Sequence, residues 1–375
     1  MDPILAWARR QQNEAIRLIR TFVECESPSD SPKQLAQFNE LLVESLGSEA
    51  RCRKAGANLV CEFVLPGSAK RTQILALGHS DTVWPMGTLN ELPFRQAQGR
   101  LWGPGVLDMK SGLVFFIFAM KALRELEVPV RHRVLLQVNS DEETGSRKSR
   151  ALTEKNAIRS QSVLVLEPGT GLTGKLKTAR KGIGDYRLTI HGAAAHAGVD
   201  FEKGASAVVE LARQLTKIAR FTNLKKGITV NPGVISGGTR SNVIAAEAEA
   251  HIDIRIPRLR DFAALDSKFK SLRPLDERCR LHLAGGLNRP PLERTPGVVR
   301  LFRMAQKLGK ELGVEVEESS TGGGSDGNFT GALGIPTLDG LGAVGEGAHA
   351  PHESILVERI ADRIALLAKL IAVIP

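Results

Sequence analysis

The stretch Gln73-Ile74-Leu75-Ala76-Leu77-Gly78-His79-Ser80-Asp81 predicts a buried strand that ends in a candidate metal ligand. Its first five residues form a mostly apolar run of strand length, and Gly78 interrupts that run. His79 at the end of such a strand is well placed to hold a metal, and the Asp81 carboxylate can orient the ring by accepting its second N–H. The same His-x-Asp pattern also occurs as an ordinary surface or capping pair. A metal site therefore requires further ligands that converge on this histidine.

Acidic residues follow two further predicted strands. The strand Arg133–Val138 runs into Glu142 and Glu143, and the strand Ser162–Leu166 ends at Glu167. A solvated turn is an alternative interpretation of the adjacent glutamates. In an open α/β sheet, ligands bind in the crevice beyond the carboxyl ends of the strands. We therefore expect these three carboxylates to lie on the same rim as the histidine.

Asp108 stands between a loop and a helix. A Pro- and Gly-rich loop covers residues 84–105, and residues 109–126 form a long apolar stretch of helical length. Asp108 is therefore expected at or beside the helix N-cap, where a carboxylate can serve as a simple cap. A second interpretation places it on the same rim as the other acids. Because crowded buried carboxylates repel unless cations neutralise them, that arrangement favours a metal site.

The chain has 375 residues, which is long for one ordinary core and predicts two domains. Residues 181–290 contain the order strand, helix, strand, strand, helix, strand, which is typical of a small ferredoxin-like domain. Helix–strand alternation resumes afterwards. We therefore expect a discontinuous α/β domain, residues 1–180 and 291–375, with a mixed, mostly parallel sheet. Residues 3–24 are expected to form one amphipathic helix.

Composition argues against several classes of protein. The net charge is 51 − 41 = +10, but the basic residues are scattered and there is a single Tyr, so we expect a basic surface rather than a nucleic-acid site. No apolar run reaches the roughly 18 residues that span a membrane, and the N-terminal residues predict no secretory signal. Cys25, Cys52, Cys61 and Cys279 lack a Cys-x-x-Cys spacing and are interpreted as reduced thiols of a cytoplasmic protein.

Five ordered motifs carry a family resemblance that covers nearly the whole chain. They are Gly78-His79-Ser80-Asp81-Thr82-Val83, Gly103-Pro104-Gly105-Val106-Leu107-Asp108-Met109-Lys110-Ser111-Gly112, Asp141-Glu142-Glu143-Thr144-Gly145, Glu167-Pro168 and His349-Ala350-Pro351-His352-Glu353. Together they resemble the di-zinc metallopeptidase family of glutamate carboxypeptidase, acetylornithine deacetylase and succinyl-diaminopimelate desuccinylase, and the glutamate carboxypeptidase type most closely. The resemblance implies a zinc-dependent hydrolase of a C–N amide bond that releases C-terminal glutamate or a similar amino acid. An N-acyl amino acid deacylase is the alternative within the class.

The resemblance also implies metal ligands, residue by residue. His79 and Glu167 would bind one zinc ion, Glu143 and His349 would bind the other, and Asp108 would bridge the two. Cobalt or manganese would suit the same ligands.

Two catalytic roles follow from the same resemblance. Glu142 would be the general base, and Asp81 would support His79 from behind. His352 stands where relatives often have Asp or Asn, so it stays open as an alternative to His349. We prefer His349 because its spacing to Glu353 matches the family.

The inserted domain is implied to act as a lid and a dimerisation domain. His196 would stabilise the oxyanion, and Asn242 would be its companion. Arg255 matches a position tied to recognition of a free substrate carboxylate, and Arg289, Lys175 and Arg180 are weaker candidates for that task. The substrate would be a small peptide or an N-acyl amino acid with a free carboxylate. The resemblance further implies a homodimer through residues 181–290, in which His196 could reach the partner's site.

Overall fold

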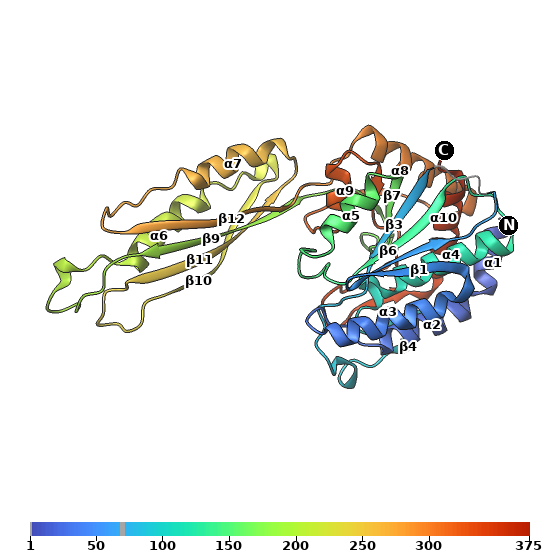
Figure 1. Ribbon diagram of the computed structural model, residues 1–375, viewed down its shortest axis with the longest axis horizontal. Coiled ribbons are helices and arrows are strands. Elements are labelled where there is room, and N and C mark those ends of the chain that lie inside the picture. Colours follow the sequence, from blue (N-terminus) through green and yellow to red (C-terminus); the bar gives the residue numbers. More distant parts are fainter. Residues whose placement is uncertain (1, 68–71) are drawn as a thin grey trace. The chain divides into compact units, whose positions relative to one another are not determined.

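The computed structural model describes residues 2–67 and 72–375. Within them the chain forms two compact units (Figure 1). The first comprises the chain up to Ala179 together with Arg294–Thr321 and Ser325–Pro375, and the second comprises Arg180–Glu293 and Gly322–Gly324. Each unit has a hydrophobic core of its own, so each can hold its elements in place independently.

A six-stranded sheet forms the centre of the first unit. In spatial order its strands are β1 (Ala50–Ala55), β2 (Asn58–Phe63), β6 (Arg133–Asn139), β3 (Gln73–His79), β7 (Ser160–Val165) and β14 (Thr337–Leu338). The β1–β2 and β2–β6 pairs are antiparallel, and the β6–β3, β3–β7 and β7–β14 pairs are parallel. The sheet is therefore mixed and mostly parallel, as the sequence predicts. β3 is buried along its whole length, which explains its mostly apolar composition.

Helices cover both faces of this sheet (Figure 1). One face packs on α1 (Pro3–Arg10), α2 (Gln12–Glu24), α3 (Pro32–Leu46), α4 (Ser111–Glu125), α8 (Pro296–Leu312) and α10 (Ile360–Val373). The other carries the shorter α5 (Arg150–Ala157) and α9 (Gly327–Ala332). α4 is buried on nearly all sides, which fixes the segment that precedes it. In the described part of the chain, no helix combines the length and apolarity needed to cross a bilayer.

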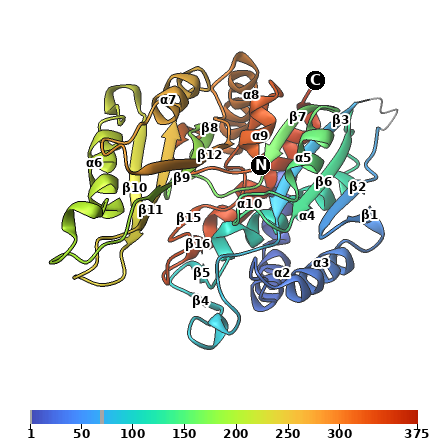
Figure 2. The ribbon, with the colours of Figure 1, turned by 60° about the vertical axis from the view of Figure 1, so that its left-hand side comes forward.

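Two small sheets complete the first unit. Figure 2 shows the larger one, whose order is β15 (Gly345–Glu346), β16 (Ser354–Leu356), β5 (Arg100–Trp102) and β4 (Arg95–Ala97). The smaller one pairs β8 (Leu176–Arg180) with β13 (Glu318–Thr321). The pairing of β16 with β5 brings the chain just after His349 beside the chain just before Asp108.

The second unit has the ferredoxin-like topology. Its elements are β9 (Gly182–His191), α6 (Ala207–Ala219), β10 (Thr229–Gly237), β11 (Glu247–Ile256), α7 (Arg260–Lys270) and β12 (Arg280–Arg289). The strand order is β10-β11-β9-β12, and every pair is antiparallel. Both helices pack on one face of the sheet, and their apolar residues share its core (Figure 1). The alternation of strands and helices in the sequence predicts this order.

The N-terminal residues form two helices rather than the single predicted helix. α1 ends at Arg10, Gln11 is the break, and α2 begins at Gln12. The apolar residues of both helices contact the same core, so the hydrophobic pattern continues across the break. Neither Gly nor Pro marks the break in the sequence, which is why the pattern alone did not reveal it.

Two of the cysteines are paired. Cys52 on β1 and Cys61 on β2 face each other in the antiparallel register and form a disulfide. The prediction of four reduced thiols is therefore wrong for these two residues, while Cys25 and Cys279 are free. The pairing arises from the register of a hairpin, which the spacing of cysteines in the sequence does not show. The cytoplasmic location, which was partly inferred from reduced thiols, stays a prediction.

Candidate metal centre

His79 lies at the carboxyl end of β3, and its ring is buried. Its Nδ1 atom is 2.9 Å from the backbone carbonyl oxygen of Asp81, to which the Nδ1–H donates. Its Nε2 atom faces two carboxylates, at 3.3 Å from Asp108 Oδ1 and 3.5 Å from Glu167 Oε1. With one ring nitrogen fixed by the backbone, the other is presented to the acidic groups.

The Asp81 carboxylate organises this part of the site. It accepts hydrogen bonds from the backbone N–H groups of Glu142 and Glu143, both at 3.1 Å, and from Ser29 Oγ at 2.8 Å. Its Oδ1 atom is also 3.4 Å from Nδ1 of His79. Burial tends to raise the pKa of Asp81, but His79 and these hydrogen bonds lower it below its ordinary value. The residue therefore supports the imidazole and also fixes the loop that carries both glutamates.

Asp108 lies between two histidines. Its Oδ1 atom is 3.3 Å from His79 Nε2, and its Oδ2 atom is 3.4 Å from His349 Nε2. Burial tends to raise the pKa of Asp108, but the hydrogen bonds from both histidines hold it well below its usual range. The N-cap prediction is wrong: α4 begins at Ser111, and Asp108 stands before it in an irregular turn, with φ −118° and ψ 93°.

His349 completes the other side of the cluster. Its Nε2 atom is 3.2 Å from Glu143 Oε1, and hydrogen bonds to Asp108 and Glu143 raise its pKa to about 10. The residue has a φ of 63°, in the left-handed region that non-glycine residues rarely adopt. Both His349 and His352 are exposed, but the His349 imidazole lies between two carboxylates of the cluster. The arrangement thus favours His349 over His352 as the ligand.

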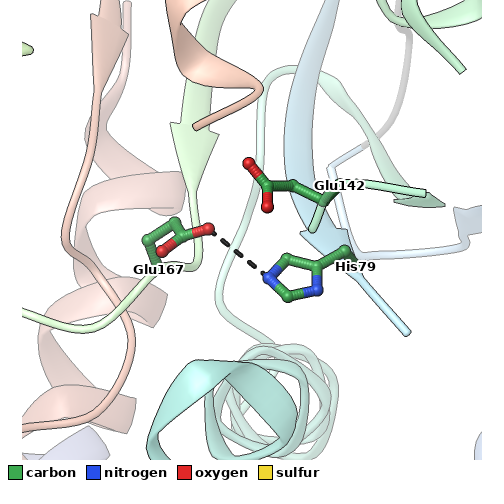
Figure 3. A group of neighbouring side chains, drawn as sticks. All are labelled: His79, Glu142 and Glu167. Carbon is green, nitrogen blue, oxygen red and sulfur yellow. Dashed lines mark ion pairs between the residues drawn. The ribbon is translucent and has the colours of Figure 1, made fainter. Parts of the chain in front are cut away.

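Ligand atoms of these residues gather in two overlapping groups. The ligand atoms of His79, Glu142 and Glu167 lie within 4.8 Å of one another, and so do those of His79, Asp108 and Glu143. Figure 3 shows Glu142 and Glu167 directed toward the His79 ring from different strands. The structure therefore brings together every predicted ligand and the predicted base, although all come from separate parts of the sequence.

The donor set fits divalent cations. Four carboxylates and two imidazoles meet at one rim, and three of the carboxylates are largely buried: Asp108, Glu143 and Glu167. Such a group carries more negative charge than the two histidines can balance even when both are protonated. Imidazole nitrogen and carboxylate oxygen are the donors that zinc, cobalt and manganese accept. The Asp108 carboxylate, with one oxygen toward each histidine, is placed to be shared by two ions.

The buried Glu353 carboxylate holds the Asp108 segment in place, a role that the sequence did not suggest. One oxygen accepts from the backbone N–H groups of Leu107 and Asp108, at 2.8 and 3.1 Å. The other accepts from Gly105 N and Trp84 Nε1, both at 2.9 Å. Burial raises the pKa of Glu353 to about 7, against the effect of these donors. In the sequence, the spacing of Glu353 from His349 is the feature that could have pointed to this role.

The two predicted residues that would stabilise the oxyanion belong to the second unit. His196 and Asn242 are exposed and neighbour each other: His196 bridges to Val243, and Ala197 N donates to the Asn242 carbonyl at 2.9 Å. Asn242 lies in a turn before β11, not within a strand.

The four cationic residues predicted to bind a substrate carboxylate differ in their contacts and burial. The Arg255 guanidinium donates to its neighbour Asp253 at 2.9 to 3.1 Å and to the Gly322 carbonyl at 3.2 Å, so it is engaged within its own unit. Arg289 is buried, at 4% exposure. Arg180 donates to the Gly324 carbonyl at 2.8 Å, and Lys175 pairs with Glu317 at 3.1 Å. None of these contacts identifies which cation meets a substrate.

Comparison with known proteins places the chain in a family. The model of Peptidase family M20/M25/M40 matches residues 75–373. Carboxypeptidase G2 from Pseudomonas sp. is 30% identical over 97% of this chain and 90% of the relative. An acetylornithine deacetylase from Erwinia tasmaniensis is 30% identical over 80% of this chain and 83% of the relative.

Solved structures share the fold. Aminopeptidase PepT from Bacillus cereus superposes with a TM-score of 0.81 at 23% identity, over 96% of this chain and 98% of the other. An M20 family metallo-carboxypeptidase from Sulfolobus solfataricus gives 0.74 at 17% identity, over 96% and 98%. The family resemblance inferred from the motifs is thus confirmed. The chain belongs to Peptidase family M20/M25/M40 and is a metal-dependent enzyme that hydrolyses amide bonds.

Proposed function

We propose that the protein is a di-zinc carboxypeptidase that releases a C-terminal glutamate or a similar amino acid. The observation that carries the proposal is the shared Asp108 carboxylate, with one oxygen 3.3 Å from His79 and the other 3.4 Å from His349. In this reading His79 and Glu167 hold one ion, and Glu143 and His349 hold the other. Cobalt or manganese are possible substitutes for zinc.

The reaction follows from the placement of the protein's own side chains. Two bound ions would polarise the scissile carbonyl and acidify a water molecule. Glu142 would take the proton of that water and pass it to the leaving amine. The Asp81 carboxylate fixes the backbone of Glu142 at 3.1 Å and so sets the position of the base. His196, with Asn242 beside it, would offset the negative charge that develops on the substrate oxygen.

The substrate would carry a free carboxylate. The similarity to carboxypeptidase G2 over nearly the whole chain supports a carboxypeptidase activity, and the motif resemblance implies glutamate as the residue released. Arg255 is the first candidate to recognise the carboxylate, because a guanidinium can bind it with two hydrogen bonds. Its guanidinium contacts Asp253, and Arg289, which is buried, is the second candidate. The acetylornithine deacetylase relative supports the alternative, an N-acyl amino acid deacylase.

We also propose a homodimer formed through residues 181–290. β10 is an edge strand of its sheet, and Val234 and Ile235 on it are 60% and 64% exposed. Val208 and Val209 on α6 are also exposed. An edge strand with exposed apolar side chains tends to pair with a strand of another chain. In a symmetric dimer, β10 of a second copy would be that strand. In such a dimer His196 could serve the partner's site.

A substrate panel tests the proposed activity. The purified enzyme with zinc is offered dipeptides and N-acyl dipeptides ending in Glu, Asp or a neutral residue, alongside N-acetyl and N-succinyl amino acids. The proposal expects fastest release from substrates that end in Glu, and complete loss of turnover with a chelator. Preferential cleavage of N-acetyl or N-succinyl amino acids would instead assign the deacylase. Turnover that persists without metal would contradict both.

A further inference from the structure

A second hollow in the first unit lies away from the metal centre. It has a volume of about 790 Å³, and its floor includes Val60, Leu135 and Gln73. These residues are on the sheet face that carries α5, beside the part of the sheet that α5 covers. Gln73 begins β3, whereas His79 ends it, and six residues of strand span about 20 Å at 3.3 Å per residue. The hollow and the metal centre are therefore at opposite ends of the same strand.

Four arginines and one acidic residue line this hollow. They are Arg51, Arg53, Arg133 and Arg159, and the acid is Glu62. Arg133 donates to Glu62 with two hydrogen bonds, at 2.7 and 2.9 Å, so this pair neutralises itself. Among the described residues, none forms an ion pair with the other three arginines. Glu62 also attracts Arg51, which stands opposite it. With four arginines and one acid, the lining of the hollow carries a net excess of three positive charges.

The sheet itself sets this arrangement. Arg51 and Arg53 alternate on β1 and stand opposite Glu62 and Val60 of β2, so all four project from the same face. The Cys52–Cys61 disulfide cross-links the two strands of this hairpin. The positions from which the two guanidiniums extend are therefore held by a short, cross-linked pair of strands.

We propose that this hollow binds a small anion that carries two or three phosphate or carboxylate groups. Guanidinium groups bind both kinds of oxyanion with paired hydrogen bonds. Its volume lies within the range of about 300 to 1,000 Å³ that is usual for small-molecule sites. Gln73 and Thr72 line it with the arginines, but their side chains are engaged with Asn156, Ser160 and His132, so the arginines supply the charged donors. The site is independent of the proposed peptidase activity, because no predicted ligand or base lines it.

Titration calorimetry with naphthalene trisulfonate tests the proposal on the metal-loaded enzyme. This probe has three negative charges and coordinates zinc weakly. The salt is held at 0.15 M, where charges more than about 8 Å apart are screened. We expect one saturable site per chain. Arg51→Gln/Arg53→Gln should weaken binding by about tenfold or more, since it removes two of the positive charges that line the hollow. Glu62→Gln should tighten binding, because it frees Arg133.

Matched variants separate this site from general attraction to a basic protein. Arg258→Gln/Arg260→Gln removes the same charge from a basic hollow in the second unit, and Glu40→Gln removes an exposed acid paired with Lys54. Both should leave probe affinity unchanged. Equal weakening by the two arginine pairs, or absence of saturable binding, would overturn the proposal. Displacement of the probe by a sugar bisphosphate identifies phosphate as the natural group, and displacement by tricarballylate identifies carboxylate; displacement by neither would also overturn it.

Discussion

Replacing Glu353 with Gln should uncouple the Asp108 segment from the His349 motif. The carboxylate of Glu353 accepts four N–H donors at 2.8 to 3.1 Å, two on each oxygen. The glutamine amide has one acceptor oxygen, and its NH₂ group would face two of these donors. Two buried N–H donors would therefore lose their acceptor, and the NH₂ group of the glutamine would face these same two donors.

The magnitude follows from those two lost acceptors. An unsatisfied buried donor costs about 1 to 3 kcal/mol, so two cost about 2 to 6 kcal/mol in total. A segment that moves to recover hydrogen bonds takes Asp108 with it. If the cost appears in metal binding, affinity falls by about 30-fold to about 20,000-fold. Because Glu353 contacts backbone and Trp84 rather than the open rim, we expect kcat to fall at limiting zinc while KM changes little.

The assay compares zinc affinity and steady-state kinetics of Glu353→Gln with those of Glu346→Gln. Glu346 is a matched control because it lies on β15 of the same small sheet and pairs with Arg100 near the surface. Zinc affinity is measured by competition with a chelating dye, and circular dichroism reports folding. The reasoning is refuted if folded Glu353→Gln binds two zinc ions as tightly as the parent and keeps its kcat.

Three further predictions concern the base, the protons and the assembly. Glu142→Ala should retain two metals by elemental analysis yet lose turnover by about 10²- to 10⁴-fold, the usual contribution of a general base; a variant as active as the parent would assign the base elsewhere. The pKa of His349 is raised to about 10, so this imidazole is protonated in the metal-free protein at pH 7.5, and that of His79 is also raised above its usual value. Zinc loading should therefore release protons, at least the one on His349, and affinity should rise with pH up to about 10; calorimetry in buffers of different ionisation enthalpy measures this, and equal heats would contradict it. Val234→Glu should convert a dimer to monomers in sedimentation experiments, whereas a parent protein that is monomeric and fully active would exclude the proposed dimer.

Part of the candidate metal centre could be predicted from the sequence because three of its residues follow recognisable strands. His79, Glu142 and Glu167 follow strands whose apolar runs are plain, and parallel strands bring their carboxyl ends to one rim. The ferredoxin-like unit was predictable for a similar reason, since its strands and helices alternate with clear breakers. In both cases the local sequence pattern predicts the strands and helices, and these elements position the residues.

Other features depend on pairings that no local pattern records. The Cys52–Cys61 disulfide follows from hairpin register, and the four donors to Glu353 come from residues some 250 positions away or more. The alternative interpretation of Asp108 as a helix cap depends on the apolar helical stretch that begins nearby, whereas the chain forms an irregular turn between Asp108 and α4. The sequence at the break between α1 and α2 likewise contains neither Gly nor Pro.

The central claim is that one carboxylate is shared by two metal ions. Anomalous diffraction at the zinc absorption edge, recorded from crystals of the zinc-loaded protein, tests it most directly. The account predicts two peaks, one between His79 and Glu167 and the other between Glu143 and His349, with Asp108 contacting both. A single peak, or two peaks of which neither contacts Asp108, would contradict it.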